Sequence, residues 1–100
     1  MRSPNRQALS PDAIDASLEE LEGWAFENDT IHRTFEFTSF REAMSFMVRI
    51  GFEAEALNHH PELTNVYGRV GVSMTTHDSG NRVTNLDVEL ARRINHLSWI

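Results

Sequence analysis

Apolar residues near the start of the chain recur at helical spacing. Ile14, Leu18 and Leu21 form one stripe among acidic residues. Ser10–Pro11 precedes this stripe and is typical of a helix start, because serine caps free amides and proline is tolerated in the first turn. Gly23 is typical of a helix end. The pattern therefore predicts a short amphipathic helix.

Two strands are predicted next, at Trp24–Phe26 and Thr30–Phe37, with the polar turn Glu27–Asp29 between them. The second strand alternates between a mostly aromatic face and a polar face. The first of these faces carries Ile31, Arg33, Phe35 and Phe37. Such alternation is typical of an antiparallel sheet with one buried face.

A long helix is predicted from about Phe40 to Asn58, with Thr38 or Ser39 as its cap. Its apolar stripe comprises Phe40, Ala43, Met44, Met47, Gly51 and Ala54, widened by Phe46, Ile50 and Leu57. A stripe this broad predicts that the helix covers a sheet.

After Pro61 the apolar pattern changes to a period of two. One face is predicted to carry Val66, Gly68, Val70, Val72 and Met74, and the other Tyr67, Arg69, Ser73, Thr75 and His77. One long strand and two short strands broken near Gly68 both fit this pattern. The segment Asp78–Asn81 predicts a turn.

A last helix is predicted from Thr84, with an apolar stripe of Leu86, Leu90, Ile94 and Leu97. Asp87 stands three residues after Thr84, where it can complete a variant capping box. The whole pattern predicts an α+β fold in the order α-β-β-α-β-β-α, with about four antiparallel strands in a single layer and three helices on one face. Residues 1–100 are expected to form one domain, in which residues 1–9 are a flexible tail.

Composition narrows the function. The chain has no cysteine, which excludes disulfides, thiolate nucleophiles and sulfur-bound metals. A formal net charge of −6 disfavours direct binding of nucleic acid. No apolar stretch has the length of a membrane span or a signal peptide, so a cytoplasmic protein is expected.

Histidines supply the candidate chemistry. His59 and His60 are adjacent and precede Pro61, and His77 ends the following apolar run. Imidazole both gives and takes protons near neutral pH, since its unperturbed pKa is about 6.5. Singly, each histidine fits a helix end or a strand end. If the helix and the strand pack together, the three converge on one pocket suited to metal-free proton transfer. None belongs to an apolar stripe, so replacing them is expected to change folding little.

The set of residues resembles the pterin-4a-carbinolamine dehydratase family, also called 4a-hydroxytetrahydrobiopterin dehydratases. The family pattern is matched by Glu55, His59-His60-Pro61, Tyr67, His77 and Asp87. Surrounding text matches as well, in Leu21-Glu22-Gly23-Trp24, Asn65-Val66-Tyr67 and Thr76-His77-Asp78. The turn before Asp87 departs from the family pattern and looks one residue longer. The resemblance covers nearly the whole domain.

The resemblance implies a lyase that removes water from a 4a-hydroxytetrahydropterin and gives a quinonoid dihydropterin, which supports recycling of the tetrahydropterin cofactor. It implies His59 and His77 as the acid/base pair, His60 as a contact to the substrate, and Asp87 as a group that orients a histidine. Glu55, Pro61 and Tyr67 are the implied substrate-binding residues. Neither a metal nor another cofactor is implied, since the pterin is the substrate. A homodimer or homotetramer is expected, because the family pairs its sheets and a half-covered sheet leaves edges to protect.

Two other functions remain open. Three histidines and Asp87 also suit a zinc or iron site, although adjacent histidines seldom both reach one ion. The second alternative is a non-catalytic dimerisation or binding module on the same fold. Some family members assist a transcription factor, and nothing in this sequence supports that role.

Overall fold

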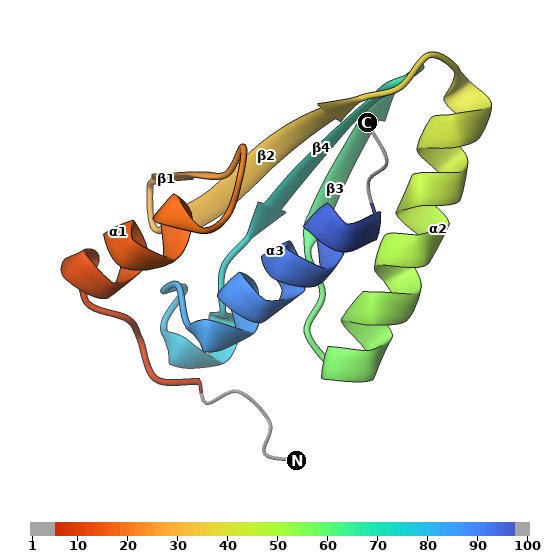
Figure 1. The fold of residues 1–100 in the computed structure, drawn as a ribbon. Helices are drawn as coiled ribbons and strands as arrows, with labels where there is room; N and C mark the ends of the chain where they lie inside the picture. Colours follow the sequence, from red (N-terminus) through yellow and green to blue (C-terminus); the bar gives the residue numbers. More distant parts are fainter. Residues whose placement is uncertain (1–5, 98–100) are drawn as a thin grey trace.

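A computed structural model describes residues 6–97, which form the predicted α+β fold. The elements are α1 (Pro11–Glu19), β1 (Ala25–Glu27), β2 (Thr30–Glu36), α2 (Phe40–Leu57), β3 (Glu62–Val66), β4 (Arg69–Met74), the 3-10 turn η1 (His77–Ser79) and α3 (Asn85–Leu97). Figure 1 shows the three helices in front of one sheet. The predicted order of helices and strands is confirmed.

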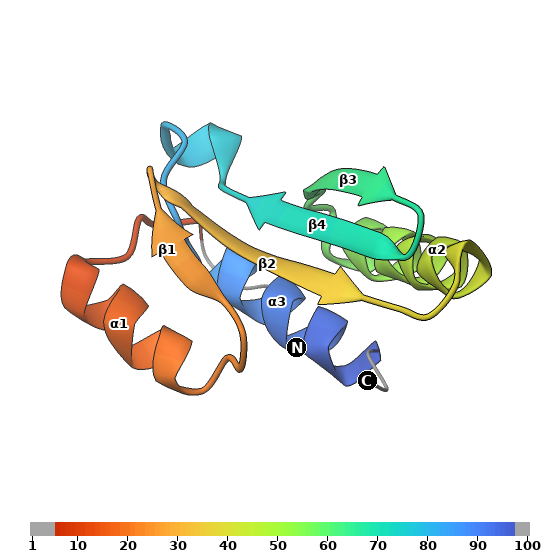
Figure 2. The same cartoon turned by 90° about the horizontal axis from the view of Figure 1, so that it is seen from above.

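The sheet has the strand order β1-β2-β4-β3, and all its pairings are antiparallel. Seen from above, α1 lies beside β1, α3 beneath β2, and α2 at the β3 end of the sheet (Figure 2). Within the described residues, the other face of the sheet carries no helix. This layering follows from the alternation in β2 and β4, which gives the sheet one apolar face and one polar face.

The core fills the space between the sheet and the helices. Its largest fully buried side chains are Phe35, Phe46, Ile31, Ile50, Met74, Leu86, Leu90, Ile94, Val70, Val72, Val83 and Thr76. The rings of Phe35 and Phe46 lie 4.7 Å apart between centroids, which joins β2 to α2. Among the described residues, no helix has both the length and the hydropathy to cross a membrane.

Helix starts follow the predicted caps. The side chain of Ser10 accepts a hydrogen bond from the Ala13 amide, and that of Ser39 accepts one from the Glu42 amide. The α1 helix nevertheless ends at Glu19, before the predicted stop. Gly23 instead turns the chain into β1 with a φ of +84°, close against the side chain of Arg33.

The region after Pro61 forms two strands, which settles the choice that the sequence leaves open. The turn at Tyr67–Gly68 folds the chain back, so Val66 pairs with Arg69 and shares its outward face. The prediction that Val66 shares a face with Val70 is therefore wrong, because the period of two does not continue through a hairpin. Glycine is needed in this turn, since a Cβ at Gly68 would lie 2.3 Å from the carbonyl oxygen of Phe37.

The buried face of α2 is narrower than predicted. Ala43, Phe46, Ile50 and Ala54 are buried. Phe40 and Met44, which the sequence assigns to the same stripe, are exposed together with Val48 and Phe52. The exposed residues follow one another every four positions and form a second side of the helix that does not face the sheet, because α2 lies at the edge of the molecule beside β3 and β4.

Candidate active site

One end of the sheet brings together the three parts of the chain that carry the candidate residues. These parts are the C-terminal end of α2, the η1 turn and the start of α3, all at the bottom of Figure 1. A cleft of about 160 Å³ lies there, lined by Arg6, Asn58, His59, His60, Thr76, His77 and Asp78. The prediction that the three histidines converge on one pocket is confirmed, since His59, His60 and His77 all line this cleft.

The end of α2 turns His59 into the protein. Asn58 takes the left-handed conformation, with φ 51° and ψ 44°, and caps the helix. The amide of His59 then donates to the carbonyl of Ala54 at 3.0 Å. Asparagine tolerates this conformation better than most residues. The adjacent His59 and His60 therefore take different directions, one inward and one outward.

His59 forms a buried pair with Asp87 of α3. Its Nε2 lies 2.6 Å from Asp87 Oδ1, and the exposed fractions of the two side chains are 7% and 0%. Hydrogen bonds to a carboxylate are strong where water is excluded. The prediction that a histidine partners Asp87 is thus matched by geometry, and the histidine is His59.

Asp87 also completes the predicted capping box. Its Oδ2 accepts from the Thr84 amide at 2.9 Å, and Thr84 Oγ1 accepts from the Leu86 amide at 3.2 Å. A third donor comes from the end of β4, where Thr76 Oγ1 lies 2.7 Å from Asp87 Oδ2. One side chain therefore starts α3 and holds His59 at the same time.

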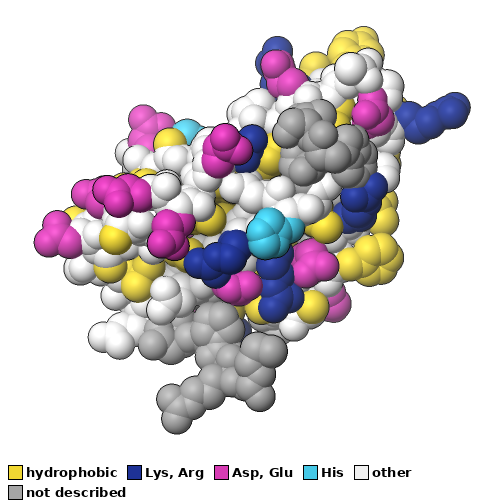
Figure 3. All heavy atoms as spheres, viewed as in Figure 1, with side chains coloured by type: hydrophobic (Ala, Val, Ile, Leu, Met, Phe, Trp, Pro, Cys, Tyr) yellow, Lys and Arg dark blue, Asp and Glu magenta, His cyan; other side chains and the backbone are white. Residues whose placement is uncertain are grey.

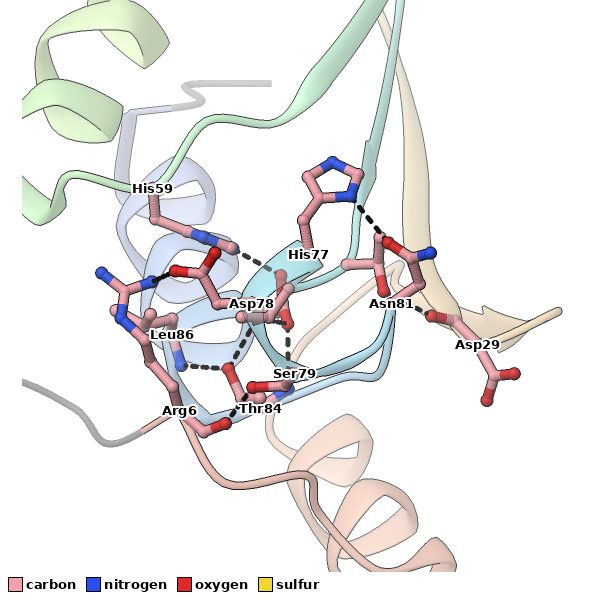
Figure 4. Close-up of polar contacts among 12 residues, drawn as sticks. Arg6, Asp29, His59, His77, Asp78, Ser79, Asn81, Thr84 and Leu86 are labelled. Carbon is pink, nitrogen blue, oxygen red and sulfur yellow. Dashed lines mark hydrogen bonds and ion pairs between the residues drawn. The ribbon is translucent and has the colours of Figure 1, made fainter.

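His77 approaches the cleft from η1. Its side chain is exposed, and its Nδ1 lies 2.7 Å from Oδ1 of Asn81 (Figure 4). An amide oxygen only accepts, so the Nδ1–H of His77 donates to Asn81. This leaves Nε2 of His77 available to exchange protons with a bound molecule.

His60 lies at the outer rim. Its Nε2 is 3.3 Å from Oε1 of Glu55, and the exposed fractions of these side chains are 62% and 74%. Water screens such a pair, so it adds little to stability. Glu55 therefore contacts the site through the side chain of His60. Pro61 comes next in the chain, is half buried, and immediately precedes β3.

Arg6 is a cleft residue that the sequence did not indicate. Residues 6–9, predicted as tail, lie against the turn after β4: the Leu9 amide donates to the Val83 carbonyl at 2.9 Å, and Ser79 donates to the Arg6 carbonyl. The Arg6 guanidinium lies 3.5 Å from Asp78 (Figure 4). Four residues of the predicted tail therefore make backbone and polar contacts with the turn after β4, and residues 1–5 lie outside the described residues. A polar segment without periodicity gives no signal for such contacts.

Thr76 and Asn81 were also missed as site residues. Thr76 stands beside His77 in a segment that matches the family pattern, so a signal was present. Its hydrogen bond to Asp87 is apparent only in the structure, where α3 brings Asp87 against Thr76.

Tyr67 does not join the cleft. It lies in the β3–β4 turn, its exposed fraction is 81%, and it lines a surface hollow with Phe40, Asn65 and Val66. The five residues of β3 separate it from Pro61 by roughly 16 Å, at about 3.3 Å per residue. Tyr67 therefore lies apart from the histidine cleft of its own chain, and its substrate-binding role stays a prediction.

Several side chains that line the cleft already form hydrogen bonds or ion pairs with protein groups. Within residues 6–97, no group of three or more histidine, aspartate or glutamate side chains is placed to hold a metal ion. Nε2 of His59 is bound by Asp87, and Nδ1 of His77 by Asn81.

The fold and the cleft define a small α+β protein that sets a buried histidine–carboxylate pair beside an exposed histidine, an arrangement suited to proton transfer. A family model described as pterin 4 alpha carbinolamine dehydratase matches residues 7–97. The chain belongs to this family, and the resemblance seen in its motifs is confirmed.

Relatives and solved structures agree with this assignment. A protein of Opitutus terrae, named provisionally as a pterin-4-alpha-carbinolamine dehydratase, is 62% identical over 87 residues, which cover 87% of this chain and 90% of that one. A crystal structure of a transcriptional coactivator/pterin dehydratase from Brucella melitensis has a TM-score of 0.87 and 39% identity, covering 91% of this chain and 98% of that one. A pterin dehydratase-like protein, described as a RuBisCO assembly factor in the alpha-carboxysome, has a TM-score of 0.62 at 16% identity, covers 76% of this chain and 87% of that one, and shares the fold alone.

Proposed function

We propose that this protein is a hydro-lyase that removes water from 4a-hydroxytetrahydropterin and releases quinonoid dihydropterin. The observation that carries the proposal is the buried pair of His59 and Asp87, 2.6 Å apart, at a cleft that His77 also lines. Membership of the family supports the substrate class. The reaction needs only proton transfers, for which the cleft has suitable groups.

The elimination moves one proton off the ring and one onto the leaving group. His59 takes the proton from the ring nitrogen beside C4a, and the electrons of that N–H bond form the carbon–nitrogen double bond. The C4a–O bond breaks with its electron pair on oxygen, and His77 protonates this oxygen to give water. The imidazolium formed at His59 is stabilised by the carboxylate of Asp87, which lies in direct contact. Transfer of the proton from His59 to His77, through solvent, restores the starting state.

His60 has a different role in this scheme. His60 is exposed and paired with Glu55, so it can contact the substrate at the rim, while the proton taken from the ring is held by the buried His59. Its contribution is to binding of the pterin or its 4a-hydroxyl. Glu55 orients His60, and Pro61 fixes the direction of the chain after it.

The proposed reaction needs no cofactor or metal, and this sets the first test. We expect purified protein to accelerate dehydration of a freshly generated 4a-carbinolamine over its spontaneous rate, and prolonged chelation to leave that rate unchanged. Steady-state absorbance of the quinonoid product provides the measurement. A rate lost on chelation and restored only by zinc or iron would favour the metalloprotein alternative, and a rate equal to the spontaneous one would favour a non-catalytic module.

Assembly is a second expected property. Phe40, Met44, Val48 and Phe52 follow one another at four-residue spacing along α2 and are exposed, with Phe52 at 71%. Figure 3 shows hydrophobic atoms at the surface along the edge formed by α2. The edge strand β3 adds the exposed side chains of Leu63 and Val66. Apolar surface of this kind is covered in most proteins, and a second copy provides the cover here.

We therefore expect a homodimer or homotetramer in solution. Light scattering at micromolar concentration should give two or four times the chain mass of 11.5 kDa. The double variant Val48→Glu, Phe52→Glu should shift this mass towards the monomer, since it places charges within the apolar stripe. Asp15→Lys, an exposed change on α1, serves as the control. A wild-type mass of 11.5 kDa alone would contradict the assembly. The cytoplasmic location stays a prediction.

A further inference from the structure

A chain of hydroxyl groups lies behind Asp87, on the side away from His59. Thr76 and Thr84 have exposed fractions of 1% and 0%, and their Oγ1 atoms are 2.7 Å apart. Thr76 Oγ1 is also 2.7 Å from Asp87 Oδ2. Figure 4 shows the other end of the chain, where Leu86 contacts Thr84. These groups are shielded from water, so their protons must be shared among themselves.

The direction of each hydrogen bond follows from the number of protons available. An ionised carboxylate only accepts, so the Thr76 hydroxyl donates to Asp87. Thr76 has no second proton, and the Thr84 hydroxyl must therefore donate to Thr76 across their 2.7 Å contact. Thr84 in turn accepts from the Leu86 amide at 3.2 Å. Every proton in the chain points towards Asp87.

The same reasoning fixes the proton on His59. Asp87 Oδ2 is occupied by Thr76 and by the Thr84 amide, so Oδ1 faces Nε2 of His59 at 2.6 Å and accepts its proton. Neutral imidazole carries one proton, and here it resides on Nε2. Within residues 6–97, Nδ1 of His59 has no hydrogen-bond partner, and His59 lines the cleft.

We propose that Thr76 and Thr84 are positioning residues that act through Asp87 to hold His59 in the Nε2–H tautomer, which leaves the Nδ1 lone pair as the base for the substrate. This proposal rests on the proposed function for the identity of the substrate. The tautomer itself follows from the hydrogen bonds alone and can be measured without any substrate.

Thr76→Val tests the role of the hydroxyl, because valine has nearly the same shape and no donor. Asp87 then loses one of its donors, and the Thr84 hydroxyl loses its acceptor. We expect kcat to fall about tenfold to 100-fold, the size expected for a lost hydrogen bond to a charged group, with little change in KM. Thr76→Ser retains the hydroxyl and should recover most of kcat. Thr75→Val is the matched control, since its hydroxyl bonds the carbonyl of Asp29 at 2.9 Å outside the cleft.

The readout that separates positioning from simple structural support is the tautomer. Nitrogen-15 NMR of the histidine rings, at a pH at which the spectrum shows His59 neutral, should place the wild-type proton on Nε2. In Thr76→Val the two nitrogen signals should move towards each other as the second tautomer becomes populated. Thr76→Ala gives the same comparison if the valine variant does not fold.

Two results would overturn the proposal. One is a wild-type His59 with its proton on Nδ1, and the other is a folded Thr76→Val or Thr76→Ala protein with unchanged kcat and an unchanged tautomer. Failure of the proposed function looks different. In that case the wild-type spectrum shows Nε2–H while no protein, wild type included, accelerates the dehydration.

Discussion

His59→Ala is expected to lower kcat for carbinolamine dehydration by a factor of about 10² to 10⁴, the range for loss of a general acid or base. His59 lies in direct contact with the buried carboxylate of Asp87, which stabilises the imidazolium formed when His59 takes the substrate proton. His77→Ala should cause a loss in the same range, because it removes the other proton-transfer group. His60→Ala should act mainly on KM, since His60 is exposed at the rim.

Stability must be measured beside activity for His59. The sequence predicts little effect on folding, but His59 is 6% exposed and is the partner of a fully buried carboxylate. Removing one member of a buried pair costs about 3–5 kcal/mol, a large part of the roughly 5–15 kcal/mol that holds a domain of this kind together. Urea unfolding of each variant separates loss of fold from loss of chemistry.

His59→Gln is the variant that keeps the fold while removing the base. Its side-chain amide can donate to Asp87 in place of the ring N–H, but it cannot take up a proton. We expect its kcat to be as low as that of His59→Ala, with more of the wild-type stability retained. Added imidazole should restore part of the activity of His59→Ala and none to His59→Gln. A folded His59→Ala, His77→Ala double variant with near-wild-type turnover would sink the mechanism.

Asp87→Asn is expected to have an effect of similar size for a different reason. The amide oxygen of asparagine can still accept from Thr76 and from the Thr84 backbone, so the start of α3 is retained. Its NH₂ group then faces Nε2 of His59 and requires a lone pair there, which moves the ring proton to Nδ1. The base is then in the wrong tautomer, a change that costs about 10⁴ in kcat in serine protease triads.

Asp87→Ala separates the two roles of this side chain. It loses the catalytic contact and also the cap, which adds about 1 kcal/mol of destabilisation, and it leaves the buried Thr76 hydroxyl without its acceptor. Asp12→Asn is the control, because Asp12 is also in the first turn of a helix but is exposed and does not line the cleft. The prediction fails if Asp87→Asn keeps full kcat while Asp87→Ala is merely less stable.

The three histidines of the cleft lie in three different surroundings. One histidine is buried against a carboxylate, one is exposed and oriented by Asn81, and one stands at the rim with Glu55. The proposed division of roles between His59 and His60 therefore depends on the helix cap at Asn58, which sends neighbouring residues in different directions.

The sequence by itself determined the order of helices and strands, because hydrophobic period and caps are local properties of the chain. Ser10, Ser39 and the pairing of Thr84 with Asp87 were all readable, since each involves residues three positions apart. The histidine motif was readable for the same reason. Its spacing is local, and only its chemistry depends on what packs around it.

Tertiary structure alone decided which groups meet. His59 and Asp87 are 28 positions apart, and their contact depends on how α2 and α3 pack against each other. Tyr67 belongs to the sequence motif, but the length of β3 separates it from the histidine cleft. Arg6 lies at the cleft because backbone contacts hold its segment there, and no side-chain pattern in the sequence predicts such contacts. Periodicity reports the face on which a residue lies, whereas a site requires the distances between faces, and these are set by packing.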